Sequence, residues 1–359
     1  MKTISTLKYA GLLACAFGIL AAMPGQSHAA NVSQIGTIPV PGTKFDNFDI
    51  SNIDPAAGQL YISDRSNAGV DVIDTHADKF LYRVGGFVGS KEKNSGSGPD
   101  GVVAVPEMKQ IWAGDGDSTL KVIDNSTPPG KLIATVPTGG KKRVDEMAYD
   151  ARDGLVVAAN NADEPAFMTL FSTKDHKILA KVIVPEASDG IEQPEYVADT
   201  GMFYVSVPAY EKSGHGAVAV FNPITMKVVK FFPINGCEPS GLVHGPGSKL
   251  LVGCAGKKGT QTVVLDYDTG KTTSIPQVSG EDEVAYNPTV KQFYTASRDW
   301  KDGPVLGVID ATTDKWIGNL QTDKGAHSVA VDDKTNKIFV PIPAGKSCPN
   351  GCVAVFQAK

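Results

Sequence analysis

The sequence predicts an all-β protein, a single seven-bladed β-propeller of four-stranded blades closed by the N-terminal strand. Three observations predict this fold: a motif that recurs seven times, a lone strand before the first repeat, and a composition rich in turn formers. The chain has 359 residues, including 38 Gly and 23 Pro, and 42% of the residues are hydrophobic. Such a composition favours many short strands over long helices or disorder.

The repeat is clearest in two nearly identical segments, Val144–Asp150 and Glu281–Asn287. Five further segments align with them on a lead position followed by an apolar run. The lead positions are 46, 100, 145, 194, 239, 282 and 327, which are separated by 54, 45, 49, 45, 43 and 45 residues. A strand-rich period of this length is the sequence signature of propeller blades.

Each repeat contains four short apolar segments separated by turn formers. In the first repeat the predicted strands are Phe48–Ile50, Gln59–Ser63, Gly69–Asp74 and Phe80–Val84. The outer hairpins turn at aspartates, because Asp side chains accept hydrogen bonds from backbone N–H groups just beyond them. Four strands per repeat correspond to one blade.

The N-terminal strand is expected to close the ring. Gln34–Val40 reads as one strand without a partner before it, whereas the last repeat supplies only Val329–Asp332, Lys337–Pro341 and Val353–Phe356. Pairing the first strand with the last repeat completes the seventh blade. Closure also removes the exposed sheet edges that an open ring would leave.

Residues 1–29 are predicted to be a signal peptide, so the propeller is expected to span residues 30–359. Lys2 and Lys8 accompany an apolar run, and small residues precede an expected cleavage site after about Ala29. The expected location is therefore the periplasm or the cell exterior. The segment ending at Cys15 also resembles a lipoprotein box, but the apolar run continues past it, which favours a cleaved secretory signal.

Composition also bears on partners. No later stretch reaches the eighteen or so apolar residues of a membrane-spanning helix. The formal net charge of −5 disfavours nucleic acid, which needs a concentrated basic face. A small molecule or an envelope protein is the expected partner, and the oligomeric state is left open.

Four cysteines follow the signal, and an even number in an exported chain predicts two disulfides. Cys237 and Cys254 flank a predicted hairpin symmetrically, so they should face each other across it. Cys348 and Cys352 would then close a small loop. A Cys-x-x-x-Cys metal site is the alternative for the second pair.

The lead residues are expected to meet at the mouth of the central channel, because inner strands of a propeller start at one face. This places Asp46, Asp100, Asp145, Asp282 and His327 together, with Glu238 and further glutamates such as Glu195, Glu281 and Glu283 beside them. Crowded oxygen ligands suit a hard cation, Ca²⁺ or Mg²⁺, while His327 would also admit Mn²⁺ or Zn²⁺. The alternative is structural, with the aspartates holding the backbone of the next blade.

Loops on the same face supply candidate ligand-binding residues. Arg298 and Arg65 are suited to hold a carboxylate or phosphate through two parallel hydrogen bonds. Asn160 lies on the corresponding loop of the third repeat. Together with the acidic lead residues they predict a polar binding site at the mouth.

The third strands carry a family resemblance. Val70–Asp74, Lys121–Asp124 and Gly307–Asp310 resemble the pattern of the YVTN-type bacterial β-propeller repeat family. The resemblance implies a propeller fold and a bacterial envelope setting, and it implies little about chemistry.

Two functions are compatible with these patterns, and whether the protein is an enzyme is left open. The first is a binding or docking protein that takes a small ligand, a divalent metal or a protein partner at the acidic mouth. Propeller subunits of periplasmic amine dehydrogenases, similar in size and compartment, dock a cofactor-bearing chain; this analogy concerns the fold only.

The alternative is a metal-dependent hydrolase or lyase of the lactonase or esterase kind. Pro99–Val102 and Cys237–Gly241 resemble blade-entry motifs of gluconolactonase-like propellers. That resemblance implies metal ligands at Asp100, Asp145 and Glu238 and a base at His327 or Glu283. Those enzymes have six blades, whereas this sequence has seven repeats.

Overall fold

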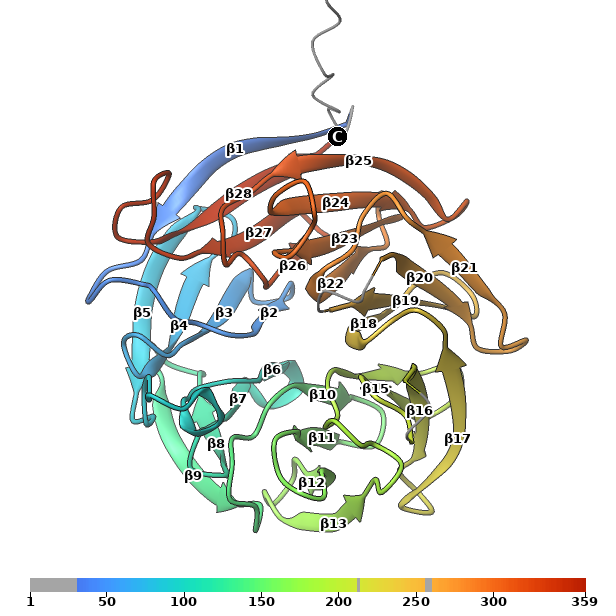
Figure 1. The fold of residues 1–359 in the computed structure, drawn as a ribbon. Helices are drawn as coiled ribbons and strands as arrows, with labels where there is room; N and C mark the ends of the chain where they lie inside the picture. Colours follow the sequence, from blue (N-terminus) through green and yellow to red (C-terminus); the bar gives the residue numbers. More distant parts are fainter. Residues whose placement is uncertain (1–30, 212–213, 256–259) are drawn as a thin grey trace, which may run out of the picture.

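The computed structural model describes residues 31–211, 214–255 and 260–359 (Figure 1). Seven four-stranded sheets stand around a common centre, so the predicted seven-bladed propeller is confirmed. Neighbouring strands within every sheet are antiparallel. The predicted signal peptide lies outside the described residues.

The first four blades follow one another along the chain. Blade 1 consists of β2 (Ser51–Asp54), β3 (Gln59–Asp64), β4 (Gly69–Asp74) and β5 (Lys79–Gly85). Blade 2 consists of β6 (Val102–Val105), β7 (Gln110–Gly114), β8 (Thr119–Asp124) and β9 (Lys131–Pro137). Blade 3 consists of β10 (Met147–Asp150), β11 (Leu155–Asn160), β12 (Phe167–Ser172) and β13 (Ile178–Ile183). Blade 4 consists of β14 (Pro194–Val197), β15 (Met202–Val207), β16 (Gly216–Asn222) and β17 (Lys227–Ile234).

The last three blades complete the ring. Blade 5 consists of β18 (Pro239–His244), β19 (Lys249–Cys254), β20 (Thr262–Asp266) and β21 (Thr272–Ile275). Blade 6 consists of β22 (Glu281–Asn287), β23 (Gln292–Ser297), β24 (Val305–Asp310) and β25 (Lys315–Gln321). Blade 7 consists of β26 (Ala330–Asp332), β27 (Lys337–Ile342), β28 (Cys352–Ala358) and β1 (Val32–Pro39). Two short 3₁₀ turns, η1 (Asn94–Gly96) and η2 (Pro106–Met108), flank β6.

The ring closes as the sequence predicts. β1 pairs antiparallel with β28, with Val32 opposite Ala358 and Pro39 opposite Cys352. In Figure 1 the blue β1 therefore lies at the outer edge of the blade that contains the red β28. The first and last segments of the described chain are thus held in one sheet.

The core lies between blades. Seven apolar clusters each join side chains of two neighbouring blades, and one of them packs β1 and β28 of blade 7 against blade 1. Both faces of the middle strands are buried because each sheet packs against two others. This explains why these strands read as continuous apolar runs in the sequence.

Aspartates form the predicted turns of the outer hairpins. The Oδ1 atom of Asp74 accepts hydrogen bonds from the N–H groups of His76 and Ala77 at 2.9 and 2.8 Å. Asp310 holds Thr312 and Thr313 in the same way, at 2.9 and 2.8 Å. The Asp that ends the third strand of blades 1, 2, 5 and 6 is therefore a folding signal for the turn that follows.

Both predicted disulfides are present. Cys237 and Cys254 have Cα atoms 4.9 Å apart, across the start of β18 and the end of β19. Cys348 and Cys352 have Cα atoms 5.8 Å apart and close the loop before β28.

Among the described residues, no helix has both the length and the apolar character needed to cross a membrane.

The inner strand of blade 1 begins later than predicted. The sequence pattern places a strand at Phe48–Ile50, whereas β2 begins at Ser51. Phe48 instead stacks on the ring of His327, with centroids 4.6 Å apart, and so belongs to the segment that leads into the blade. This shift of three residues changes which acidic side chain of blade 1 faces the channel.

Candidate functional site

Four consecutive blades place a carboxylate at the same point, two residues before the inner strand. The backbone N–H of this residue donates to the second strand of its own blade: Asp49 to Ser63, Asp100 to Gly114, Asp145 to Ala159 and Glu192 to Ser206, at 2.7 to 3.0 Å. A return bond from the second strand to the following residue accompanies each of them. These four side chains are therefore structurally equivalent, and the ring brings them to one face.

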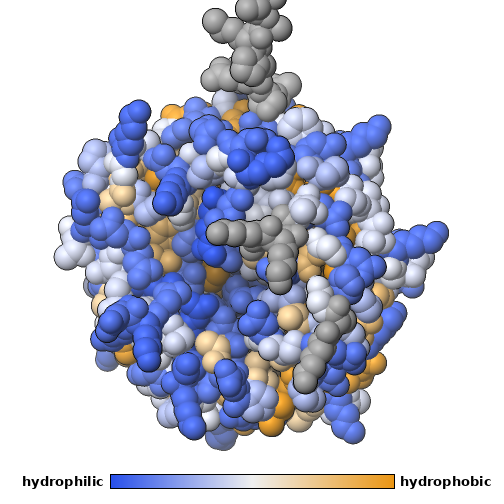
Figure 2. Space-filling view, viewed as in Figure 1, coloured by the Kyte–Doolittle hydropathy of each residue, from blue (hydrophilic) through white to orange (hydrophobic). Residues whose placement is uncertain are grey.

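A polar cavity of about 290 Å³ lies at this face. Figure 2 shows hydrophilic side chains around the hollow at the centre of the ring. Its charged lining includes five carboxylates, Asp49, Asp145, Glu146, Glu192 and Asp282, and three guanidinium groups, Arg65, Arg143 and Arg298. We call this space the mouth cavity. Its charged lining carries more negative than positive groups.

Arg65 is a structural cation between blades 1 and 2. Its Nη2 atom forms ion pairs with both Asp49 and Asp100, and its Nη1 donates to Asn94 at 3.1 Å. The side chain is only 3% exposed, so this guanidinium is not available to a ligand. It lies after β3 and ties the entry segments of two neighbouring blades together.

The two carboxyl groups beside Arg65 have pKa values shifted in opposite directions. Burial opposes the ionisation of Asp49, but the charge of Arg65 and a hydrogen bond from His327 outweigh it and lower the pKa of Asp49 below its ordinary range. Burial raises the pKa of Asp100 well above its ordinary value despite Arg65. The two carboxyl groups share one positive charge, and a low-dielectric site cannot hold both as anions at little cost.

Asp145 has two polar partners. The Nη2 atom of Arg143 lies 2.5 Å from its Oδ2 atom, and the amide of Asn161 donates to the same oxygen at 2.5 Å. Burial raises the pKa of Asp145 to about 6, against the opposing charge of Arg143. Asp145 thus takes its partners from the loop between blades 2 and 3 and from the residue that follows β11.

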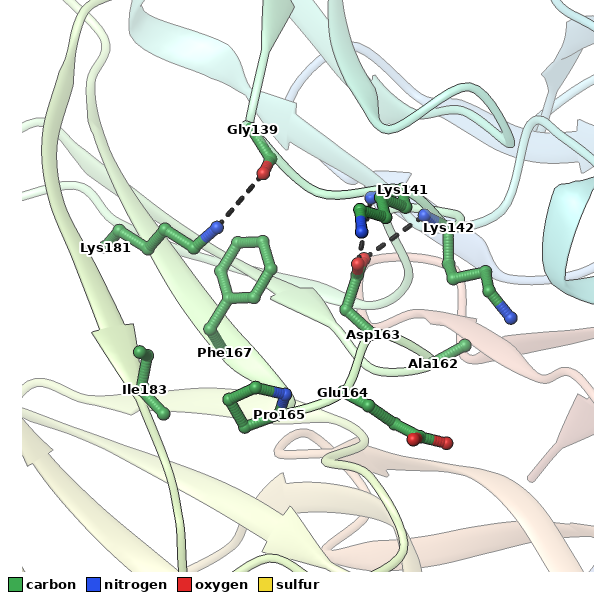
Figure 3. Close-up of a pocket in the computed structure, with 10 residues that line it drawn as sticks. All are labelled: Gly139, Lys141, Lys142, Ala162, Asp163, Glu164, Pro165, Phe167, Lys181 and Ile183. Atoms are coloured by element: carbon green, nitrogen blue, oxygen red, sulfur yellow. Dashed lines mark hydrogen bonds between the residues drawn. The ribbon is translucent and has the colours of Figure 1, made fainter.

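The segment that carries Arg143 is anchored on the outside of the ring. Figure 3 shows this anchor: the carboxylate of Asp163 accepts hydrogen bonds from the backbone N–H groups of Lys141 and Lys142 at 2.9 and 3.2 Å. Lys181 donates to the carbonyl of Gly139 at 3.1 Å. The hollow in Figure 3, at about 420 Å³, is larger than the mouth cavity, but these polar groups are already paired within it. Asp163 thus holds the backbone of the two residues that precede Arg143.

Glu146 and Glu192 are less well compensated: at Glu192, burial and the charge of Asp145 raise the pKa and outweigh the charge of Arg143 and a hydrogen bond with Glu146, which lower it. Glu146 is 3% exposed, and its Oε2 atom is buried without a hydrogen-bond partner. Burial raises the pKa of Glu146 well above its ordinary value, and the charges of Glu192 and Asp145 raise it further. Burial, followed by the charge of Asp145, raises the pKa of Glu192 to about 8. A nearby positive charge would therefore lower the pKa of both side chains and favour their ionised forms.

Two groups of carboxylates are close enough to share a cation. The first is Asp49, Asp100 and Asp145, and the second is Asp145, Glu146 and Glu192; within each group the potential ligand atoms lie within 4.8 Å of one another. Arg65 already lies between Asp49 and Asp100 in the first group. The second group contains the unpartnered oxygen of Glu146.

Blade 6 lines the opposite wall. Arg298 pairs with Asp282 at 2.8 Å and with Asp299 at 3.4 Å, and Ser240 donates to Asp282 at 3.1 Å. Burial lowers the pKa of Arg298, but the charge of Asp282 outweighs this effect and raises it. Arg298 is 36% exposed at its side chain, so it is the most accessible of the three arginines.

His327 faces acceptors with both ring nitrogens. Nδ1 lies 2.6 Å from the carbonyl oxygen of Gly325, and Nε2 lies 3.5 Å from Oδ1 of Asp49. The ring also stacks on Phe48. Both ring nitrogens therefore lie beside oxygen atoms of the protein itself.

The structure brings together some of the predicted site residues and separates others. Asp145, Asp282, Arg65, Arg298 and His327 line the mouth cavity, and Asp100 lies buried behind Arg65. Asp46 is exposed outside the cavity, and its place is taken by Asp49. Glu238 is half-buried in blade 5 and does not line the cavity.

Three further predicted residues lie outside the mouth cavity. Asn160 is fully buried and bonds to Ser118, Thr138 and Thr169, so its neighbour Asn161 is the residue that reaches Asp145. Glu283 is buried, and it lines a hollow formed by the inner strands deeper in the channel. Glu195 lines that hollow too.

Sequence reasoning missed Asp49, Glu192 and Arg143. The signal for Glu192 was present, since Asp100, Asp145 and Glu192 are separated by 45 and 47 residues, close to the repeat period. The alignment on Pro194 hid it because the apolar run of blade 4 starts with a proline. Arg143 carries no such signal, because it precedes the repeated motif and acts from the loop between blades.

Comparisons with known proteins identify the fold. No protein family matches this sequence, and no curated protein matches it. Among solved structures, a chain of hydrazine synthase from Kuenenia stuttgartiensis superposes with a TM-score of 0.72 at 14% sequence identity. The match covers 88% of this chain and 96% of that chain. At this identity the similarity establishes a shared propeller architecture and no shared chemistry.

Proposed function

We propose that this protein is an exported binding or docking propeller whose mouth cavity takes up a positively charged group. The observation that supports it is the lining of the mouth cavity, where five carboxylates meet three guanidinium groups. Burial and neighbouring carboxylates raise the pKa of Glu146 and of Glu192, so a cationic group of a small ligand or of a partner protein that displaces their protons also relieves the repulsion among the carboxylates. A rigid ring of seven sheets holds the carboxylates in place before the ligand arrives, which lowers the entropic cost of binding.

The compartment and the family are part of the same proposal. Two disulfides fit an oxidising compartment such as the periplasm or the cell exterior. A signal peptide over residues 1–29 would deliver the chain there. The resemblance of the third strands to YVTN-type repeats supports membership of that family, although no family model matches the sequence.

Binding is better supported than the hydrolase alternative. A lactonase-like mechanism needs a base beside a bound metal. His327 has acceptors at both nitrogens, and Glu283 lies deeper in the channel than the mouth cavity. Neither arrangement offers a base to a substrate in the cavity.

The test is calorimetric titration of the protein from residue 30 onward with CaCl₂, MgCl₂, putrescine, spermidine and, as an anionic counterpart, citrate. At least one cation should bind, and citrate should not. The double variant Glu146→Gln/Glu192→Gln should lose that binding, whereas Glu195→Gln, which changes a glutamate deeper in the channel, should retain it. The proposed function fails if no cation binds or if citrate alone does.

A further inference from the structure

We propose that Asp145, Glu146 and Glu192 form a binding site for one hard divalent cation, Ca²⁺, in the wall of the mouth cavity. The inference deepens the proposed function and rests on it. It assigns the positively charged group to a metal ion and the ligands to three carboxylates at the entries of blades 3 and 4.

The spacing of the three side chains fits a single ion. Their potential ligand atoms all lie within 4.8 Å of one another. Ca²⁺ binds oxygens at about 2.3–2.6 Å, so two ligands on opposite sides of the ion are at most about 5 Å apart. The centre of three atoms with this spacing is at most about 2.8 Å from each of them, so side-chain shifts of a few tenths of an ångström bring all three carboxylates to one ion.

An unpartnered buried oxygen marks the same place independently. Oε2 of Glu146 has no hydrogen-bond partner among the described residues, and it belongs to a residue that lines the mouth cavity and is only 3% exposed. A buried polar atom without a partner carries a large desolvation cost. A cation in the cavity removes that cost, because it supplies the partner that the protein does not.

The neighbouring carboxylate group shows what a filled site looks like. Between Asp49 and Asp100, the guanidinium of Arg65 provides the cation from the chain itself. In the second group, Arg143 forms an ion pair with Oδ2 of Asp145. Asp145 needs to contribute only one ligand atom to the group, so the ion pair and the metal can coexist at one carboxylate.

The ligand types select the metal. All three ligands are carboxylate oxygens, which suit hard cations and give no advantage to thiolate- or imidazole-binding metals. Mg²⁺ demands a strict octahedron and usually keeps several waters with one or two protein carboxylates. Three carboxylates at the wall of a cavity open to water match the larger and more variable coordination of Ca²⁺.

The experiment is titration of the chelator-treated protein, from residue 30 onward, with CaCl₂ and separately with MgCl₂ by calorimetry. The expected result is one Ca²⁺ per chain, with weaker Mg²⁺ binding. Glu146→Gln and Glu192→Gln should each raise the Kd for Ca²⁺ roughly tenfold or more, because each removes a charged ligand. Glu195→Gln should leave the Kd unchanged, and circular dichroism should show all variants folded.

Other outcomes separate this inference from the function on which it rests. If putrescine or spermidine binds and Ca²⁺ does not, the metal site is overturned while the cation-binding function stands. If Ca²⁺ binds equally well to both glutamine variants, the assignment of the ligands is overturned. If the wild-type protein binds neither metal nor amine, both proposals fall, whatever the variants do.

Discussion

Buried carboxylates in this protein differ in the partners that surround them. Glu281 accepts hydrogen bonds from the backbone N–H of Cys254 and from Thr262, so it serves the packing of blade 5 against blade 6. Asp49 and Asp100 share Arg65. Glu146 has a buried oxygen with no partner. Glutamates in blades 6 and 3 are thus both buried, but only Glu281 has both carboxylate oxygens in hydrogen bonds.

Arg65→Met should be strongly destabilising. The substitution leaves Asp49 and Asp100 buried and without their shared cation, and breaking a buried ion pair typically costs about 3–5 kcal/mol. Urea unfolding followed by circular dichroism measures the loss. Arg152→Met is the control, because Arg152 is 52% exposed and its ion pair with Asp153 lies at the surface; it should leave the midpoint nearly unchanged. Equal losses in the two variants would contradict a structural role for Arg65.

Glu195 should make stability depend on pH. Its carboxylate accepts the backbone N–H of His244 at 2.9 Å, and burial raises its pKa from the ordinary 4.5 to about 7. A raised pKa means that the folded state holds the proton more tightly than the unfolded state. The stability that this group contributes is therefore complete below pH 4.5 and is lost as the pH rises to about 7.

Glu195→Gln removes this loss, because the amide stays neutral and still offers an oxygen to His244. Relative to the parent, the variant should gain stability between pH 4.5 and 7 and keep a constant advantage above pH 7. Urea midpoints at four pH values measure the difference. Glu164→Gln, at an exposed position, should run parallel to the parent. A constant difference between Glu195→Gln and the parent at every pH would refute the prediction.

At the scale of the elements, blade entries pack backbone against backbone. A Cβ atom on Gly101, just before β6, would lie 2.0 Å from the carbonyl oxygen of Asp145 in the next blade. Glycine is therefore required at this position by the close approach of two inner-strand entries. The same contact places Asp100 and Asp145 side by side at the mouth.

Gly101→Ala should destabilise the protein by about 1–3 kcal/mol or more, the usual cost of overpacking. Gly36→Ala in β1 is the matched control, because nothing lies within 4 Å of the position of its added Cβ. Thermal unfolding of the two variants measures the contrast. Similar Tm values for both would show that the blades can separate at their entries without cost.

At the scale of the whole molecule, stability depends on closing the ring. β1 pairs with β28, and Ser51 of blade 1 bonds through its backbone N–H to the hydroxyl of Ser328 in blade 7 at 2.8 Å. Ile38 of β1 packs with Phe48 and Phe339 in the cluster between blades 7 and 1. β1 thus forms the outer strand of blade 7 and also contributes to the apolar cluster between blades 7 and 1.

Ile38→Ala should therefore cost about 2–5 kcal/mol, as expected for a truncated core side chain. Ile35→Ala in the same strand should have little effect, because Ile35 is 51% exposed. Guanidinium unfolding curves for both variants give the comparison. If Ile38→Ala unfolds at the same denaturant concentration as Ile35→Ala, β1 is not part of the cooperative unit.

The repeat period and the apolar runs were enough to predict seven blades and the closing strand, and the even cysteine count with the symmetry of one hairpin predicted both cysteine pairs. They were also enough to place Asp100 and Asp145 at the mouth, because these residues directly precede unbroken apolar strands. They misplaced the entries of blades 1 and 4. There the residues at 46 and 194 were aligned on the apolar runs behind them, at the two longest steps of the repeat, but Asp49 and Glu192 occupy the equivalent backbone position.

The sequence by itself determined the architecture, because the strand pattern and the turn residues are local properties that recur in each repeat. What only the tertiary structure decided is which charges meet. Arg65 reaches Asp49 and Asp100, Arg143 reaches Asp145 from an inter-blade loop, and Glu146 is left with an unpartnered oxygen. These contacts depend on the register between neighbouring blades, which is set by packing across the ring and is not written in any one repeat.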